Sequence, residues 1–250
     1  MDSGVISLMI KLSKIYKSFK EVTVLRGLDL EIPAGKITVI LGSSGEGKSV
    51  LLKHIIGLLR PDQGTVQVDD VDLSTLDEKQ LNEFRKRFGM LFQNAALFDS
   101  MTVEENIAFP LQEHTQLLED QIHERVLEKL KLVGLEQAIA KMPSELSGGM
   151  RKRVGLARAI ALEPKIILYD EPTTGLDPLM TGSINRLIVS MQKKLQVTSV
   201  LISHDVESAF EIADFVAMLH EGKIIAQGSP VEFRKSSHPF VKRFLERRAE

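Results

Sequence analysis

The chain has 250 residues and a formal net charge of −2. Its basic clusters, at residues 85–87, 151–153 and 242–248, lie in helical patterns that predict solvated faces. We therefore expect no nucleic acid partner. It has no cysteine, which excludes disulfides and thiol chemistry. It also lacks an apolar run of about 18 residues and a basic start followed by an apolar core, so we expect a soluble cytoplasmic protein.

The first 92 residues are predicted to form a β-rich part of the fold. Strands are predicted at residues 5–12, 22–30, 31–41, 65–68 and 89–92. Pro33, Ala34 and Gly35 form a turn signal within this series. A helix is predicted over residues 77–87, and Ser74 or Asp77 is its expected N-cap.

Residues 42–49 (GSSGEGKS) fit the P-loop pattern Gly-x-x-x-x-Gly-Lys-Ser/Thr, between an apolar strand at 36–41 and a helix predicted over 50–59. Glycines permit a tight turn whose backbone N–H groups point at phosphate oxygens, and the start of the helix adds a positive dipole end. Lys48 is predicted to reach the β- and γ-phosphates, and the Ser49 hydroxyl to ligate Mg²⁺. The alternative is a glycine-rich turn that binds nothing. The predicted phosphate-binding residues are Gly42, Ser43, Ser44, Gly45, Glu46, Gly47, Lys48 and Ser49.

The middle of the chain is predicted to be a helical insertion between strands of the main sheet. Helical patterns cover residues 103–109, 120–133, 135–141 and 148–162, with Pro110, Gly134 and Pro143 as breakers between them. From Lys165 onward, strands are predicted at 165–169, 199–203, 215–219 and 223–226, and helices at 178–195, 205–213 and 240–248. This alternation predicts a parallel sheet covered by helices on both faces.

The apolar strand at residues 166–171 (IILYDE) ends in two carboxylates, where α/β sheets place their ligands. Asp170 is the expected Mg²⁺ partner, and Glu171 is the expected general base for an attacking water. Gln93, just after the strand at 89–92, is expected to reach Mg²⁺ or that water. The alternative, a solvated strand end and loop amide, is less favoured because a P-loop lies upstream.

Residues 146–150 (LSGGM) form a second predicted anion-binding helix start. Ser147 is a typical N-cap, and Gly148 and Gly149 leave backbone N–H groups open. One nucleotide has one γ-phosphate, which the P-loop already binds, so a second cradle is redundant unless it serves another copy of the protein. The alternative is an ordinary capped helix.

His204 follows the strand at 199–203, where a histidine can donate to a γ-phosphate and sense its presence. A structural role is the alternative for this residue. The remaining histidines are interpreted as structural, because none is predicted at the end of a strand beside a motif: His54, His114, His123, His220 and His238.

In this order, residues 42–49, Gln93, 146–150, 166–171, 175–177 and His204 resemble the nucleotide-binding subunit of ABC transporters over essentially the whole chain. The resemblance implies a single α/β domain with a P-loop NTPase (RecA-like) core, an antiparallel β subdomain and an inserted helical subdomain. Its expected parts are residues 1–93, 94–162 and 163–250.

The same resemblance implies an ATPase that dimerises head to tail, so that each P-loop faces Ser147, Gly148 and Gly149 of the other copy. The second cradle is then no longer redundant. By position, Gln93, Asp177 and His204 would be the Q-loop, D-loop and H-loop residues, and Phe19, or alternatively Tyr16, would stack on adenine. The expected ligands are ATP and Mg²⁺.

A narrower resemblance, to the ATPase of Mce/Mla-type lipid transporters, is carried by residues 85–98 (RKRFGMLFQNAALF), 109–117, 142–150 and the unusual Met150. It implies a membrane permease that contacts residues near 93–110, an Mce-domain lipid-binding subunit, a STAS-domain partner and a place on the cytoplasmic side of the inner membrane. The main alternative is the ATPase of an ABC importer for amino acids, metals or another small solute. Glu46 replaces the small residue usual in the P-loop and should repel phosphates unless it turns outward.

Overall fold

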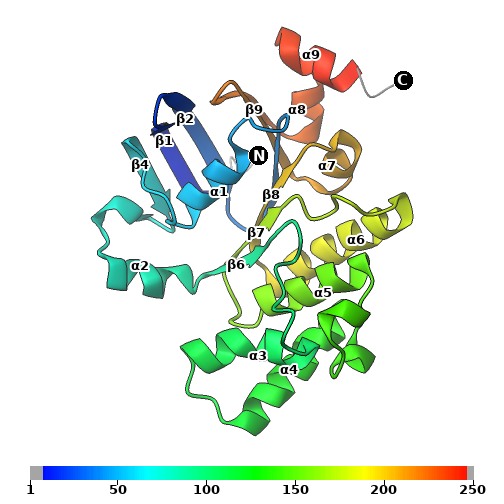
Figure 1. Ribbon diagram of the computed structural model, residues 1–250. Helices are drawn as coiled ribbons and strands as arrows, with labels where there is room; N and C mark the ends of the chain where they lie inside the picture. Colours follow the sequence, from blue (N-terminus) through cyan, green and yellow to red (C-terminus); the bar gives the residue numbers. More distant parts are fainter. Residues whose placement is uncertain (1–7, 247–250) are drawn as a thin grey trace, which may run out of the picture. The chain divides into compact units, whose positions relative to one another are not determined.

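The structure, a computed structural model, describes residues 8–246 (Figure 1). The chain divides into two compact units. The first unit runs up to Arg85 and resumes at Thr198, and the second runs from Lys86 to Val197. Within the described range, no helix combines the length and apolar character needed to cross a bilayer.

The first unit contains an antiparallel sheet in the order β2-β1-β4-β5. Its strands are β1 (Leu8–Phe19), β2 (Val22–Pro33), β4 (Gln63–Val68) and β5 (Val71–Asp72). The predicted strand at residues 5–12 begins outside the described residues and continues to Phe19, further than expected. A bulge between Leu12 and Ile15, with Lys14 at φ 50°, interrupts the alternation and hides this continuation in the sequence.

The same unit contains the strand order β10-β9-β3-β8, which includes the strand before the P-loop. The fully buried β3 (Ile37–Leu41) pairs in parallel with β8 (Thr198–Ser203) and β9 (Phe215–His220), as predicted. The prediction is wrong for β10 (Lys223–Gly228), which runs antiparallel to β9. Glu221 and Gly222, at φ 48° and 75°, form a tight hairpin turn between these two strands.

The helices of the first unit are α1 (Lys48–Ile55), α2 (Glu78–Arg85), α7 (Val206–Ile212), α8 (Pro230–Arg234) and α9 (Pro239–Glu246), with a 3₁₀ turn at Leu73–Thr75. The P-loop helix α1 ends earlier than predicted. Gly57 has a φ of 72°, and the N–H groups of Leu58 and Leu59 turn back to the carbonyl of Lys53 (2.8 and 3.0 Å). The helix α8 was not predicted because five residues are too few to show a helical period.

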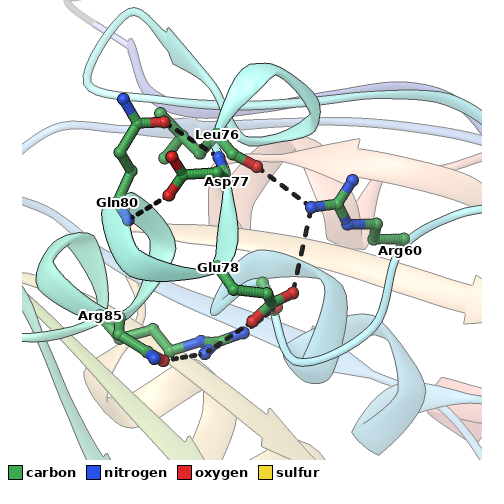
Figure 2. A network of polar contacts seen from close by, with 8 residues as sticks. Arg60, Leu76, Asp77, Glu78, Gln80 and Arg85 are labelled. Carbon is green, nitrogen blue, oxygen red and sulfur yellow. Dashed lines mark hydrogen bonds and ion pairs between the residues drawn. The ribbon is translucent and has the colours of Figure 1, made fainter.

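Helix α2 is fastened at both ends by the contacts shown in Figure 2. At its start, the Asp77 carboxylate accepts from the N–H of Gln80 (2.8 Å), and the Gln80 side chain accepts from the N–H of Asp77 (2.9 Å), so Asp77 is the N-cap. Near its end, Arg85 donates to the carbonyl of Gly57 (2.7 Å) and lies 3.9 Å from Glu78. Arg60 lies 4.0 Å from the same carboxylate, so α2 is tied to the turn that ends the P-loop helix.

The second unit has two parallel strands, β6 (Phe88–Leu91) and β7 (Ile166–Asp170), and is otherwise mostly helical, as predicted. Its helices are α3 (Val103–His114), α4 (Glu119–Val133), α5 (Gly148–Ala159) and α6 (Pro178–Leu195), with 3₁₀ turns at Glu136–Ala138 and Pro143–Glu145. Two predictions are wrong here. Pro110 lies inside α3, where the burial of the helix's apolar side chains compensates for the free energy of one lost backbone hydrogen bond. The helix expected at 135–141 is only a 3₁₀ turn.

Candidate active site

The P-loop has the geometry of a phosphate cradle. Gly45 and Gly47 have φ values of 84° and 97°, which favour glycine. A Cβ on Gly42 would lie 2.7 Å from the carbonyl oxygen of Leu219, so the loop tolerates only glycine at this close approach. No side chain caps the start of α1. Lys48 is buried at 5% exposure, and its ammonium donates to the carbonyls at the base of the loop, 2.8 and 2.9 Å away.

The strand register brings His204 to the edge of the sheet where the P-loop begins. Leu41 of β3 lies opposite Ser203 of β8, so Gly42 and His204 are the next residues of two neighbouring parallel strands. The half-buried His204 is followed directly by Asp205, whose carboxylate caps α7. The backbone of the histidine is therefore held between a strand and a capped helix.

Phe19 and Tyr16, the two candidates to stack on adenine, both lie on the hairpin that packs on the P-loop. Phe19 and Tyr16 are 42% and 41% exposed, and Phe19 lies opposite Val22 in the β1–β2 hairpin. Two residues further along β2, Val24 would lie 2.7 Å from a Cβ on Gly47, so this hairpin packs directly on the P-loop. The Tyr16 ring covers Gly27, where an added Cβ would lie 2.6 Å from its hydroxyl, which favours plain packing for the tyrosine.

One histidine was misinterpreted from the sequence. His220 is the last residue of β9, and its Nδ1 lies 2.9 Å from the carboxylate of the P-loop residue Glu46. It therefore lies at a strand end beside a motif, contrary to the prediction. A sequence signal did exist: the strand predicted at 215–219 ends immediately before this residue.

In the second unit, a matching register brings Gln93 beside the acidic pair. Leu91 of β6 lies opposite Tyr169 of β7, so the residues that follow both strands leave the sheet at one edge. Asp170 ends β7, and Glu171 has an unusual φ of 46°. The hydroxyl of Thr174 donates to the Glu171 carboxylate at 2.9 Å, which fixes the direction of the proposed general base.

Lys152 joins these two segments, and the sequence did not reveal it. Residues 151–153 were predicted to be a solvated face, but Lys152 is 5% exposed, and its ammonium donates to the carbonyls of Gln93 and Glu171. Burial lowers the pKa of Lys152, and the carboxylates of Asp170 and Glu171 oppose that shift. Arg153 is engaged too, since its guanidinium donates to the carbonyl of Val133 at 2.8 Å. The available signal was helical spacing: Lys152 lies four residues after Gly148, so both residues share the helix face that carries the LSGGM segment.

The LSGGM segment starts α5 as predicted. Ser147 is exposed, and its hydroxyl accepts from the N–H of Met150 at 3.3 Å. Asp177 caps α6, and the Met180 side chain of that helix lies where a Cβ on Gly149 would be, 2.0 Å away. A hollow of about 260 Å³ is lined by residues of the predicted Q-loop, signature and D-loop segments, with others beside them: Gln93, Gly148, Lys152, Thr174 and Leu176.

The predicted Mg²⁺ ligands are all oxygen donors, which Mg²⁺ prefers: Ser49 in the first unit offers a hydroxyl, and Gln93 and Asp170 in the second unit offer an amide and a carboxylate. In the part of the chain that the structure describes, no group of three or more His, Cys, Asp or Glu side chains could hold a metal alone. Mg²⁺ on a nucleotide usually takes most of its ligands from phosphate oxygens and water, so it needs few donors from the protein.

Comparisons with known proteins show which family the chain resembles. The family model described as "ABC transporter" matches residues 25–174. The intermembrane phospholipid transport system ATP-binding protein MlaF of Haemophilus influenzae is 48% identical over 87% of this chain and 83% of its own. MlaF of Escherichia coli K12 is 46% identical over 88% and 81%. The probable ribonucleotide transport ATP-binding protein mkl of Mycobacterium leprae is 44% identical over 94% and 68%.

Solved structures agree as well. CbiO1 from Clostridium perfringens, part of the ABC transporter complex cbiONQ, has a TM-score of 0.84 at 32% identity, over 96% of this chain and 99% of that one. A dimeric ATP-binding cassette, MJ0796 in a post-hydrolysis state with ADP and Pi, has a TM-score of 0.82 at 31% identity, over 89% and 99%. The chain therefore belongs to the ABC transporter family and is the ATP-hydrolysing subunit of such a transporter.

Proposed function

We propose that this chain powers a phospholipid transporter of the Mla type. The observation that carries the proposal is the identity of 46–48% to two proteins named as ATP-binding subunits of intermembrane phospholipid transport, over 87–88% of this chain. The segment MPSELSGGM at residues 142–150, with methionine after the two glycines, supports it. The name of the mkl relatives supplies the rival substrate, a ribonucleotide.

We infer that hydrolysis divides into binding by the first unit and water activation by the second. Lys48 and the backbone N–H groups of the P-loop hold the phosphates, and Phe19 stacks on adenine. Glu171 accepts a proton from the attacking water, a role that the Thr174 hydrogen bond supports by fixing its carboxylate. Gln93 and His204 position the water and the γ-phosphate. Ser49, Asp170 and Gln93 would hold Mg²⁺, which would neutralise charge developing on the phosphates.

We further propose that Ser147, Gly148 and Gly149 bind the γ-phosphate held by a second copy of the chain. The exposure of Ser147 and its place at the start of a twelve-residue helix support this, because such a start presents N–H groups to an anion. Only a triphosphate reaches both cradles, so ATP favours the closed head-to-tail dimer and hydrolysis releases it.

The permease is proposed to dock in an apolar groove of the second unit. The groove has a volume of about 470 Å³ and overlaps the predicted contact region, because Phe98, Phe109 and Pro110 line part of it. Phe92 and Phe98 are 40% and 43% exposed. Arg158 lies 5.8 Å from the Phe98 ring and donates to two carbonyls of the loop after β6, so movement in the groove would reach the loop that carries Gln93.

The remaining proposed partners are an Mce-domain lipid-binding subunit and a STAS-domain protein. The chain itself would lie on the cytoplasmic face of the inner membrane, attached through the permease. These assignments rest on the resemblance to Mce/Mla-type ATPases and share its test.

The test is to purify the complex that forms around this chain and to measure ATP hydrolysis together with the bound and transferred cargo. Glu171→Gln should retain ATP binding and lower turnover by roughly 10²–10⁴-fold, the usual scale for a general base. Phospholipid should copurify with the complex and move between vesicles only with ATP and intact Glu171. Ribonucleotide transfer without lipid transfer would replace the proposed cargo, and unchanged turnover in Glu171→Gln would remove this residue from its role.

A further inference from the structure

The P-loop of this chain contains a carboxylate whose two oxygens are both occupied. Oε1 of Glu46 lies 2.9 Å from Nδ1 of His220, and Oε2 accepts the backbone N–H of Glu221 at 2.6 Å. The Glu46 side chain is only 17% exposed and that of His220 is 22% exposed. The carboxylate is therefore directed toward the β9–β10 turn and held there at two points.

The turn that holds Glu46 is itself fixed on β2. The N–H of Arg26 donates to the carbonyl of Gly222 at 2.9 Å. Gly222 has a φ of 75°, and a Cβ on it would lie 2.5 Å from the carbonyl oxygen of Val24. The same Val24 packs against Gly47, so the turn and the P-loop share one neighbour on β2.

Helix α9 holds the histidine in place. The rings of His220 and Phe240 stack with centroids 3.5 Å apart and planes 15° apart. Phe244, one turn later on α9, lies 6.0 Å from the Phe240 ring. A continuous series of contacts therefore runs from the C-terminal helix through His220 to the middle of the P-loop.

We call the contacts of Glu46 to His220 and to the Glu221 N–H the Glu46 latch. The charges around it favour a Glu46 carboxylate that points away from the P-loop. The adjacent hollow, with a volume of about 430 Å³, is lined by three cationic side chains, Arg26, Lys223 and Arg243, and by one carboxylate, that of Glu221. A nucleotide in the P-loop would instead bring several negative charges close to any carboxylate of that loop. We propose that Glu46 and His220 are positioning residues. The Glu46 latch, held in place by α9, keeps the negative charge of Glu46 away from the phosphates. It thereby sets the affinity of this P-loop for nucleoside polyphosphates.

The proposal predicts an effect that depends on the charge of the nucleotide. In His220→Ala, Glu46 keeps only its contact to the Glu221 N–H, so its carboxylate can move toward the phosphates and should weaken ATP binding by about tenfold. The loss should be smaller for ADP and smaller again for AMP, because the repulsion scales with phosphate charge. It should shrink in about 1 M salt, where the Debye length is about 3 Å. Glu46→Gln in the same background should restore ATP affinity, since the amide carries no charge. Phe240→Ala should act in the same direction as His220→Ala, but by about threefold.

The experiment is a nucleotide titration of the full chain by fluorescence, with ATP, ADP and AMP, for His220→Ala, Glu46→Gln, the double variant and Phe240→Ala. His123→Ala is the matched control, because it breaks a comparable contact to Glu104 in the other unit and should change nothing. Lys48→Ala tests ATP binding itself and separates failure of the family function from failure of the latch. Unchanged ATP affinity in His220→Ala, an equal loss for all three nucleotides, or no recovery in the double variant would overturn the proposal. Unchanged affinity in Phe240→Ala would remove α9 from it.

Discussion

Replacing Lys152 with methionine should weaken the fold and slow hydrolysis together. The ammonium of Lys152 is buried between the carbonyl of Gln93, to which it donates, and the carbonyl of Glu171, 3.5 Å away. These carbonyls belong to the two residues proposed to position and activate the attacking water. Methionine has a similar length but cannot donate to either of them, so the change removes the link and leaves the shape nearly intact.

The magnitude follows from one charge-assisted hydrogen bond. Losing the bond to Gln93 and leaving its carbonyl unpaired costs about 1.5–3 kcal/mol, and the long contact to Glu171 adds little. Removing a charge from a buried position returns part of this cost, and burial indeed lowers the pKa of Lys152. We expect a net loss of about 2 kcal/mol in the free energy of unfolding. Turnover should fall by roughly tenfold to a hundredfold, because small displacements of catalytic groups are costly.

The assay is urea unfolding combined with steady-state phosphate release at saturating ATP. Lys129→Met is the matched control in the same unit, because Lys129 is 1% exposed and its ammonium lies 3.0 Å from the Glu163 carboxylate, which belongs to none of the motifs. This control should lose stability and keep its turnover. Equal turnover in the two variants, or a Lys152→Met protein that is as stable and active as the unmodified chain, would refute the reasoning.

Two further predictions concern dimerisation and pH. Mixing Ser147→Arg with Lys48→Ala subunits should recover ATP-dependent dimers, measured by light scattering, because one composite site per mixed dimer stays intact; absence of recovery would rule out completion in trans. Burial lowers the pKa of His54 in the folded chain. At pH values between this lowered pKa and about 6.5, His54 binds a proton only in the unfolded chain. The free energy of unfolding should therefore fall as the pH drops through this window. Urea midpoints from pH 8 to pH 5 should show a shallower fall in His54→Leu; an equal fall in both proteins would contradict this.

The catalytic motifs could be predicted because each is a contiguous pattern with its own chemistry. The P-loop glycines, the IILYDE strand and the capped LSGGM helix all follow from local rules, and the structure places them at strand ends and helix starts as expected. The strand register accounts for the rest of this success. Since Leu41 lies opposite Ser203, and Leu91 opposite Tyr169, each motif leaves the sheet beside a second polar residue.

The residues that position those motifs were not predicted, because their partners lie in distant parts of the chain and the local signals did not identify them. Lys152 lies 59 residues after Gln93, and His220 lies 174 residues after Glu46. In a sequence, each appears as an ordinary cation on a helix or a histidine at the end of a strand. Composition cannot show that a neighbouring carbonyl or carboxylate faces it. Both cases have one physical requirement in common: a charged group that folding takes out of water needs a polar partner, and here the contact joins a distant residue to a loop of the predicted site. A buried charged side chain beside a motif therefore identifies the loop that it positions. Variants that keep the size of the side chain but remove its charge distinguish its effect on positioning from its effect on packing.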